Sequence, residues 1–502
     1  MNRASPAWEP DARANDCGLL MPQRPSRDSG NNILWETLPY DLSRAYDVYN
    51  TLLKPMEDLL AGKHLLVVPS SALNQLPMHV LITRLPADTP DAMHSRTVGK
   101  LDITLRDVSL ARQAHHGKGV IIERADPGGP ADKAGLRSGD IVLAVADTEV
   151  QSIPQTIAAI RGHAPGSELS LRIVRNDQEL KLTATVGELN IQERPPRIFK
   201  AGQDREIQWL ARSNAITVLP SISALSSLRV RGKASTAMRP ILGIGNPLLD
   251  GSAAEHASAQ LARSKQSCPE LVRLVRTAST RRPVRMGGTR GAYGRIANTA
   301  EILAQSPLPE TADELCAVAA SLSAAPDDVL LGQNATEATV KRLSQSGRLA
   351  EYRVLHFATH GTLGGEFEGL DQAGLLLTPP DKGSEEDDGY LSAHEITQLR
   401  INADWVVLSA CNTAGRSLSH AQLPRAFFYA GARSLLASHW PVASEATVKL
   451  VTATLRNAAS TPASGRAEAL RQSMLSMIEH GEVHETHPAF WAPFVMMGEG
   501  AQ

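Results

Sequence analysis

Two residues of the chain have the chemistry of a nucleophile and a base, Cys411 and His360. Each follows an apolar run, residues 405–408 before Cys411 and residues 354–357 before His360, and each is followed by small residues. A free thiol with a pKa of about 8.5 is mostly protonated at neutral pH, and a nearby imidazole raises its thiolate fraction and later protonates the leaving amine. The two side chains therefore have the types that a cysteine hydrolase needs.

Both apolar runs are predicted strands of an open α/β sheet. The carboxyl ends of parallel strands meet at one crevice, so His360 and Cys411 can be neighbours although they are 51 positions apart (411 minus 360). The backbone amides of Gly361 and Cys411 are candidates for an oxyanion hole, because both would lie beside the attacked carbonyl.

Strand and helix periodicity predict an α/β fold, a mostly parallel sheet flanked by helices. A smaller β-rich domain with shorter runs interrupts it. We expect a flexible N-terminal tail at residues 1–32, the first part of the α/β domain at 33–100, the β-rich insert at 101–192, and the remainder with both reactive residues at 193–500. Residues 251–294 read as a long surface loop to which no role is assigned.

Composition excludes several classes of protein. The 502 residues are 42% hydrophobic and 21% charged, close to a soluble globular average, and the formal net charge is -2. The chain has no global basic field for nucleic acid or an anionic membrane, and its apolar runs are far below the roughly 20 residues that span a bilayer. The first 30 residues lack the apolar region of a secretory signal, so a cytoplasmic location is expected.

The four cysteines are few and widely scattered, which argues against a disulfide framework or a zinc module. Cys17, Cys268 and Cys316 are interpreted as inert thiols. The alternative for Cys411 is a buried structural thiol. A metal site formed by His360, Cys411 and His439 is a weaker alternative, because no pair of ligands has metal-binding spacing. No metal and no cofactor are predicted.

Four motifs resemble the CHAT domain, which shares the caspase and separase fold. They are His-Phe-Ala-Thr-His-Gly at 356–361, Leu-Ser-Ala-Cys-Asn-Thr at 408–413, Arg-Ala-Phe-Phe-Tyr-Ala-Gly-Ala-Arg-Ser at 425–434 and His-Pro-Ala-Phe-Trp-Ala-Pro-Phe at 487–494. Upstream, residues 66–77, 218–225 and Gly245-Asn-Pro247 match CHAT elements too.

The resemblance implies a cysteine endopeptidase that cleaves a protein or peptide substrate, with His360 as general base and acid and Cys411 as nucleophile. Asp371 is the candidate for selecting a basic side chain at the scissile position, and a solvated loop carboxylate is the alternative. The acidic run at 385–388 is interpreted as a solvated loop. A non-catalytic scaffold that binds partner proteins is the competing hypothesis. Any sensor or regulator would be the insert or a separate protein.

The insert strongly resembles a bacterial PDZ domain. The resemblance rests on Gly-Pro-Ala-Asp-Lys-Ala-Gly-Leu-Arg-Ser-Gly-Asp at 129–140. It implies capture of a peptide ligand by strand addition, with loop amides holding the ligand's carboxylate. The residues expected at this site are Gly117, Lys118, Gly119, Val120, Ile122 and Ile157. A domain that serves only as a rigid spacer or regulator is the alternative.

Overall fold

The structure is a computed structural model. It describes residues 23–500 apart from 28–32, 38, 70–72, 74–75, 90–92, 108–118, 151–152, 177, 222–234, 269–295, 363, 366, 368–369, 410–421 and 441–443. The chain forms two compact units. The smaller comprises Met1–Met21, Pro39–Arg44 and Leu85–Ile198, and the larger comprises Pro22–Leu38, Ala45–Arg84 and Phe199–Gln502.

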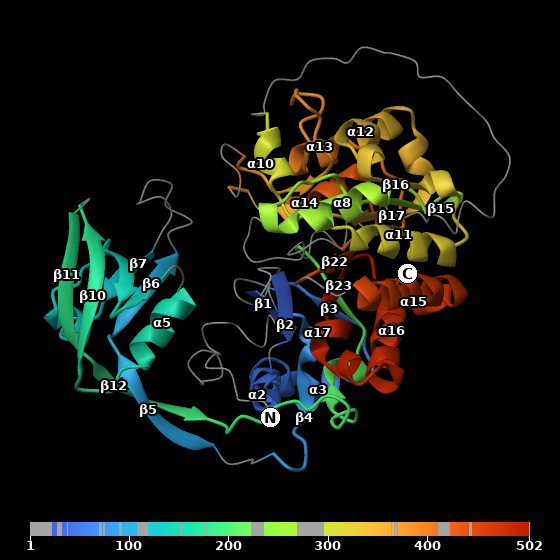
Figure 1. Cartoon of the computed structure of the whole chain (residues 1–502). Helices are drawn as coiled ribbons and strands as arrows, with labels where there is room; N and C mark the ends of the chain where they lie inside the picture. The colour runs from blue at the N-terminus through green and yellow to red at the C-terminus, as the bar shows by residue number, and fades with distance from the viewer. Residues whose placement is uncertain are drawn as a thin grey trace. The chain divides into compact units, whose positions relative to one another are not determined.

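The larger unit is built on an eight-stranded, mostly parallel sheet with the order β16-β15-β17-β21-β22-β23-β14-β3 (Figure 1). Its strands are β3 (Leu65–Val67), β14 (Ile216–Val218), β15 (Arg239–Gly245), β16 (Val329–Leu331), β17 (Tyr352–Ala358), β21 (Trp405–Leu408), β22 (Ser434–Ser438) and β23 (Phe494–Gly498). The pairing of β22 with β23 is antiparallel, and the other six pairings are parallel. β3 and β14 are parallel neighbours although the smaller unit separates them in sequence.

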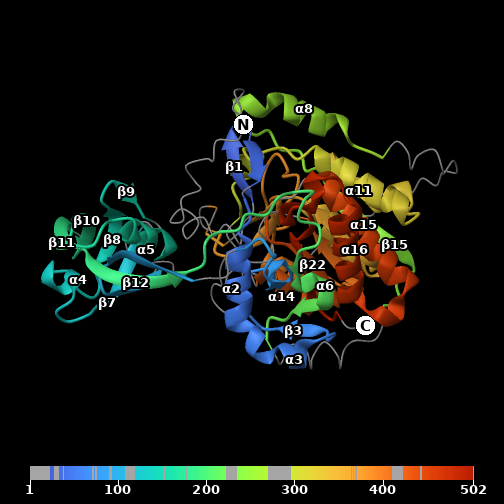
Figure 2. The same ribbon diagram turned by 90° about the horizontal axis from the view of Figure 1, so that it is seen from below.

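Helices cover both faces of this sheet (Figures 1 and 2). One face carries α12 (Glu337–Gln345), α13 (Ala393–Gln398) and α14 (Gln422–Ala430), and the other carries α11 (Glu310–Ser321), α15 (Ser444–Ser460) and α16 (Arg466–His480). A large core cluster lies under α12, α13 and α14, where Phe357 of β17 packs against Phe427 of α14 with ring centroids 5.5 Å apart. Because helices cover both faces of the sheet, its central strands are continuous apolar runs, and β21 with the sequence Trp-Val-Val-Leu is one of them.

Shorter elements complete the larger unit. They include most of α2 (Leu42–Leu52), the 3-10 turn η2 (Lys54–Met56), α3 (Glu57–Leu60), β4 (Ile82–Arg84), β13 (Gln208–Trp209), α6 (Leu210–Ser213), η7 (Ala253–Glu255), α8 (His256–Ser264), α10 (Thr299–Leu303) and α17 (Pro488–Trp491). A three-stranded antiparallel sheet begins just after the end of β17, with the order β18 (Gly361–Thr362), β19 (Gly374–Leu376) and β20 (Tyr390–Ser392).

The smaller unit contains a six-stranded antiparallel sheet, in which β9 (Thr148–Glu149) pairs with β8 beside the path β11-β10-β8-β7-β6. The path strands are β6 (Ile103–Asp107), β7 (Val120–Ala125), β8 (Ile141–Val145), β10 (Glu168–Arg175) and β11 (Gln178–Thr185). Helices α4 (Pro130–Lys133) and α5 (Ile153–Arg161) belong to the same unit, as does the separate pair of β5 (His94–Lys100) with β12 (Gly187–Glu193). Asn176 has a φ of 46° in the hairpin turn, because asparagine tolerates the left-handed region.

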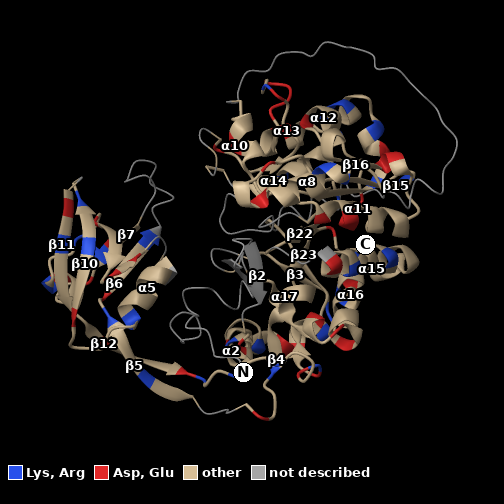
Figure 3. Ribbon diagram, in the orientation of Figure 1, with Lys and Arg blue, Asp and Glu red and all other residues tan. Residues whose placement is uncertain are grey.

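The expectation of a loose tail up to residue 32 needs one correction. Gln23–Arg27 form strand β1, which pairs antiparallel with β2 (Ile33–Thr37), so part of this segment is regularly paired. Lys, Arg, Asp and Glu residues are interspersed over the described elements of each unit (Figure 3). None of the described helices is long and apolar enough to cross a membrane.

Candidate active site

His360 lies just beyond the carboxyl end of β17, and its ring is oriented by a backbone carbonyl. Nε2 is 2.7 Å from the carbonyl oxygen of Ser306. A carbonyl oxygen can only accept a hydrogen bond, so Nε2 must carry the hydrogen and Nδ1 is left as the ring atom that can take up a proton. The neutral imidazole therefore has one defined tautomer.

The backbone around His360 is held through two nearby threonines. The hydroxyl of Thr359 donates to the carbonyl oxygen of Leu376, and Leu376 N donates to the carbonyl oxygen of His360 across 2.9 Å. On the other side, Thr362 Oγ1 lies 2.8 Å from the hydroxyl of Tyr390, which donates to the carbonyl oxygen of Gln372. These bonds fix His360 to the β18-β19-β20 sheet.

Burial lowers the pKa of His360 below 6.5, while the Ser306 carbonyl and the more distant charge of Glu255 oppose this shift. Desolvation disfavours the charged imidazolium, so the ring is held in the uncharged form at neutral pH. A base needs that form in order to accept a proton from a thiol.

The paired register of β17 and β21 brings the two predicted catalytic segments to one edge of the sheet. Phe357 is paired with Leu408, His360 follows three residues after Phe357, and Cys411 follows three residues after Leu408. Cys411 itself lies outside the described residues, as does its proposed oxyanion amide. Gly361, the other expected donor, opens β18 opposite Leu375.

The carboxyl end of β21 is tied to the neighbouring elements by a buried polar cluster. Ser409 Oγ donates to Glu314 Oε1 of α11 across 2.6 Å, and His356 Nε2 of β17 lies 2.9 Å from Glu314 Oε1 and 3.0 Å from Ser409 Oγ. The side chains of His356 and Glu314 are 0% and 4% exposed. The cluster fixes Ser409, two residues before Cys411, to a helix and to the strand that precedes His360.

These three residues have the types of a serine hydrolase triad, but their geometry differs from one. In such a triad the carboxylate binds one ring nitrogen and the serine binds the other. Here Glu314 and Ser409 share Nε2 of His356, while the buried Nδ1 has no hydrogen-bond partner among the described residues. The cluster is therefore structural.

Helix α11 also carries a disulfide, which corrects the expectation of inert thiols. Cys316 is bonded to Cys268, with Cα atoms 5.4 Å apart and a sequence separation of 48. Two cysteines so far apart in sequence give no pattern from which a single bridge can be deduced. The bond joins α11 to the segment that follows α8.

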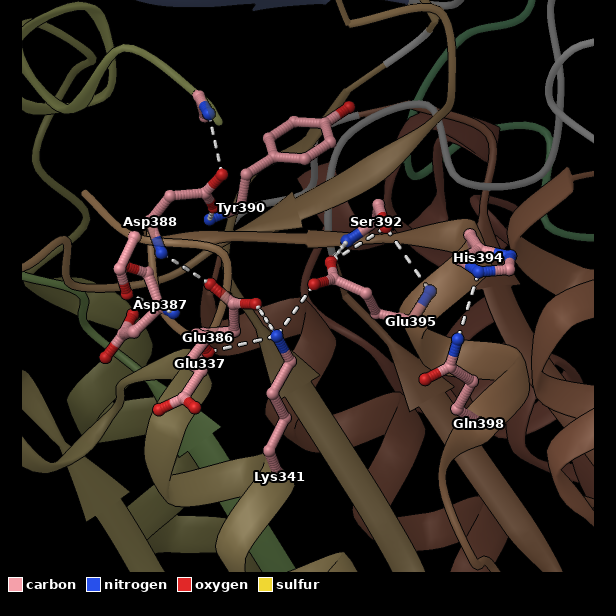
Figure 4. Close-up of polar contacts among 12 residues, drawn as sticks. Glu337, Lys341, Glu386, Asp387, Asp388, Tyr390, Ser392, His394, Glu395 and Gln398 are labelled. Carbon is pink, nitrogen blue, oxygen red and sulfur yellow. Dashed lines mark hydrogen bonds and ion pairs between the residues drawn. The ribbon is translucent and has the colours of Figure 1, made fainter. Parts of the chain in front are cut away.

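The acidic run at 385–388 is not simply a solvated loop (Figure 4). Glu337 Oε2 accepts hydrogen bonds from the amides of Asp388 and Gly389 at 2.8 and 3.2 Å. The ammonium of Lys341 contacts both Glu337 and Glu395, and the Glu337 side chain is 1% exposed. Burial, and then the charge of Glu395, raise the pKa of Glu337 to about 9. Of the four residues in the run, Glu385 and Glu386 are exposed as expected, whereas Asp387 and Asp388 are half-buried.

Two other sequence candidates receive no support as a site. Asp371 is exposed, at the base of a loop closed by the hydrogen bond from Gly365 N to the carbonyl oxygen of Leu370, and its proposed role stays a prediction. His439 is buried after β22 and stacks on Trp440 with ring centroids 6.2 Å apart. Within the described ranges, no group of three His, Cys, Asp or Glu side chains is arranged to hold a metal ion.

The expected ligand strand of the smaller unit also needs correction. β7, which begins at Val120, pairs with β6 on one side and β8 on the other, so it has no free edge for strand addition. Ile122 is buried in the core of this unit, and Gly117 and Lys118 lie outside the described residues. The edge strand on this side of the sheet is β6, and helix α5 contacts it. Gly119 has a φ of 93° and approaches the backbone of Val142, which is a structural reason for glycine there.

Comparison with known protein families agrees with this architecture. The CHAT domain family matches residues 182–499, and the PDZ domain family matches residues 99–186. The chain belongs to the CHAT domain family. The mixed α/β fold with its mostly parallel sheet is thus a CHAT fold, and it carries a PDZ domain on its N-terminal side.

Curated relatives resemble the PDZ region of this CHAT protein. A probable periplasmic serine endoprotease DegP-like from Halomonas elongata is 36% identical over 74 residues, or 14% of this chain and 15% of the relative. A namesake from Rickettsia conorii is 30% identical over 88 residues, or 17% of each chain. Serine endoprotease DegS from Escherichia coli is 28% identical over 71 residues, or 14% of this chain and 20% of the relative. The chain thus spans a fifth or less of each.

Among solved structures, the HtrA3 PDZ domain bound to a phage-derived ligand is 19% identical, with a TM-score of 0.17, and the match covers 20% of this chain and 93% of that one. The HtrA-type protease AlgW with a decapeptide is 23% identical, with a TM-score of 0.18, and the match covers 18% of this chain and 30% of that one.

Sequence reasoning missed the residues that support the site. Ser306 contributes a carbonyl oxygen, for which side-chain type carries no signal. His356 and Ser409 stand in two of the recognised CHAT motifs. Because side chains alternate between the faces of a strand, Ser409 lies on the same face as Val407, which is paired with His356. Two polar residues in otherwise apolar runs were therefore a signal that could have marked this cluster.

Proposed function

We propose that the CHAT domain is a cysteine endopeptidase in which His360 activates Cys411. The observation that carries the proposal is the orientation of His360, whose Nε2 donates to Ser306 and leaves Nδ1 for proton transfer. The register of β17 and β21 supports it, because the two segments end at the same edge of the sheet.

In the proposed reaction, Nδ1 of His360 takes the thiol proton of Cys411 as sulfur attacks the peptide carbonyl. The amides of Gly361 and Cys411 would stabilise the oxyanion. The imidazolium then gives its proton to the leaving amine, and a thioester remains on Cys411. Water, deprotonated by the same ring nitrogen, hydrolyses the thioester and releases the thiol.

Alkylation with iodoacetamide tests this proposal without a known substrate. An activated Cys411 should react near neutral pH much faster than a free thiol, and His360→Ala should remove the difference. Cys17→Ala is the matched control and should leave the fast rate unchanged. A wild-type rate equal to that of a free thiol would support the non-catalytic scaffold instead.

The natural substrate can be sought by comparing new protein N-termini after expression of the wild type and of Cys411→Ala. Cleavage sites that appear only with the wild type would define the residue before the scissile bond. A basic residue there would support a role for Asp371, and Asp371→Asn should then weaken cleavage.

We further propose that the PDZ domain captures a peptide along β6, because strand addition needs an exposed edge. Ile157, which is half-buried on α5, would contact the ligand. Ile157→Ala should weaken binding of a selected phage-display peptide in a fluorescence anisotropy assay. Gln155→Ala, on an exposed part of the same helix, is the control and should bind normally.

The disulfide bears on location. Structural disulfides persist in oxidising compartments and are rare in the cytosol, so Cys268–Cys316 weighs against the cytoplasmic expectation. We therefore propose an oxidising compartment, which fractionation of the expressing cells would check.

A further inference from the structure

His360 is oriented by a segment that is distant in sequence and that must itself be held in place. Ser306 follows α10, the short helix at Thr299–Leu303, whose first turn is capped by Asn298. At the far end of the helix, the carbonyl oxygen of Leu303 accepts a hydrogen bond from Asp250 N across 2.7 Å. The other contact that holds this segment lies just before the start of α10, at Ala297.

Asp388 provides that contact. Its Oδ2 accepts a hydrogen bond from Ala297 N across 2.6 Å, and its Oδ1 accepts one from Tyr390 N across 2.9 Å. One carboxylate thus joins the start of the α10 segment to the start of β20 (Figure 4).

The two arms of this carboxylate converge on His360. Through Ala297 and α10, the first arm reaches Ser306, which binds the imidazole. The second arm runs through Tyr390, whose hydroxyl meets Thr362, two residues after His360. Ala297, Ile302 and Tyr390 are buried in one apolar cluster, which makes the two arms a single packed body.

Asp388 is in turn supported from the opposite side. Glu337 binds its amide, and Lys341 binds Glu337. Neither Glu337 nor Lys341 contacts His360 directly in the described structure, so the acidic run acts through the backbone that it holds rather than through electrostatic interaction with the ring.

We propose that Asp388 is a positioning residue for His360, which sets both the ring and the backbone of the base. The inference rests on the proposed function, because His360 needs a fixed Nδ1 only if it is the base. Loss of Asp388 should free the α10 segment and let more water reach the half-buried His360, while the side chains of His360 and Cys411 stay unchanged.

The test uses full-length protein with labelled histidine, in which NMR follows the titration of His360 and iodoacetamide measures Cys411 at pH 7. His360→Gln assigns the resonance. In Asp388→Ala the pKa of His360 should rise toward 6.5, and alkylation should slow by about tenfold or more, as for a misplaced catalytic group. Asp388→Asn, which keeps one acceptor oxygen, should change both readouts less. Tyr390→Phe removes only the contact between the Tyr390 hydroxyl and Thr362, so it should also change both readouts less than Asp388→Ala does.

Glu385→Gln is the matched control, since it removes one charge from an exposed position of the same run and should leave both readouts as in the wild type. A folded Asp388→Ala protein with wild-type His360 titration and alkylation would overturn the proposal. If that variant does not fold, unchanged readouts in both Asp388→Asn and Tyr390→Phe would overturn it. Slow alkylation in the wild type would count against the peptidase proposal, while His360 titration would still test Asp388.

Discussion

The hydroxyl of Ser409 donates to Glu314 across 2.6 Å, and this bond joins the end of β21 to helix α11. Because Glu314 is buried and also meets His356, the bond links the strand before Cys411 to the strand before His360. The spacing of the segments that carry the two proposed catalytic residues therefore depends on a contact that neither His360 nor Cys411 makes.

Ser409→Ala should lower the free energy of unfolding by about 1 to 3 kcal/mol, because the buried Glu314 loses a donor. It should also slow alkylation of Cys411. Ser434→Ala removes a buried hydroxyl from β22 whose bond goes to the carbonyl oxygen of Glu499, so it should cost stability without changing the alkylation rate. Equal alkylation in both variants would contradict the linkage.

The reaction of Cys411 should lose rate in acid with a midpoint below pH 6.5. Burial lowers the pKa of His360, so the uncharged base persists to lower pH than a solvated histidine would. The rate of alkylation, measured from pH 5 to 8, checks this. A midpoint at or above 6.5 would mean that another group controls the thiol.

His79 should make the larger unit sensitive to acid. Its pKa is lowered to about 4 by burial, which the hydrogen bond with the carbonyl oxygen of Ala492 offsets only in part. Between pH 6.5 and 4 the unfolded chain is protonated at His79 and the folded chain is not. The free energy of unfolding should therefore fall by about 3 kcal/mol as pH drops from 6.5 to 4.

Urea unfolding followed by tryptophan fluorescence measures this loss, because no tryptophan lies between residues 85 and 198 and the signal does not report that segment. His79→Gln should flatten the pH dependence. His480→Gln is the control, since the His480 side chain is 77% exposed. If the free energy of unfolding of His79→Gln depends on pH as in the wild type, other groups cause the acid sensitivity.

Lys341→Met should lower the free energy of unfolding by about 3 kcal/mol, because it leaves the Glu395 carboxylate without its ammonium partner and the buried Glu337 without a hydrogen-bond donor. The raised pKa of Glu337, about 9 against 4.5, means that the folded chain keeps a proton that the unfolded chain releases. Wild-type stability should thus fall as pH rises between these values. Glu337→Gln should reduce that slope, and urea titrations at pH 6 and 8.5 would show whether it does.

Removing the disulfide with Cys268→Ser and Cys316→Ser should destabilise the larger unit by up to about 4 kcal/mol, as expected for a closed loop of this size. The melting temperature, compared with that of Cys17→Ser, checks this. No difference between the two proteins would mean that the bond is absent in solution.

The fold was readable from the sequence where periodicity is strong. The apolar runs before His360 and Cys411, which were predicted as strands of a parallel sheet, are the neighbouring parallel strands β17 and β21. What escaped prediction depends on tertiary contacts. An aspartate in a charge run can be solvated or buried, and the long-range contacts of Asp388, with Ala297 91 positions away and with Glu337, are not visible in the local sequence.

The PDZ domain shows the same limit. Its motif at 129–140 identified the family, but the ligand edge depends on which strands pair, and β7 has a neighbour on each side. Strand pairing in an antiparallel sheet is a long-range property that local spacing does not determine.

The bond between Cys268 and Cys316 has a practical consequence for any assay of this protein. Thiol reductants are added to keep a nucleophilic cysteine active, yet the same reagent would reduce the disulfide that anchors α11. Helix α11 carries Glu314, the hydrogen-bond partner of Ser409. The activity proposed for Cys411 should therefore be sought across a graded series of redox buffers, where an optimum at intermediate potential would indicate a reduced Cys411 together with an intact Cys268–Cys316 bond.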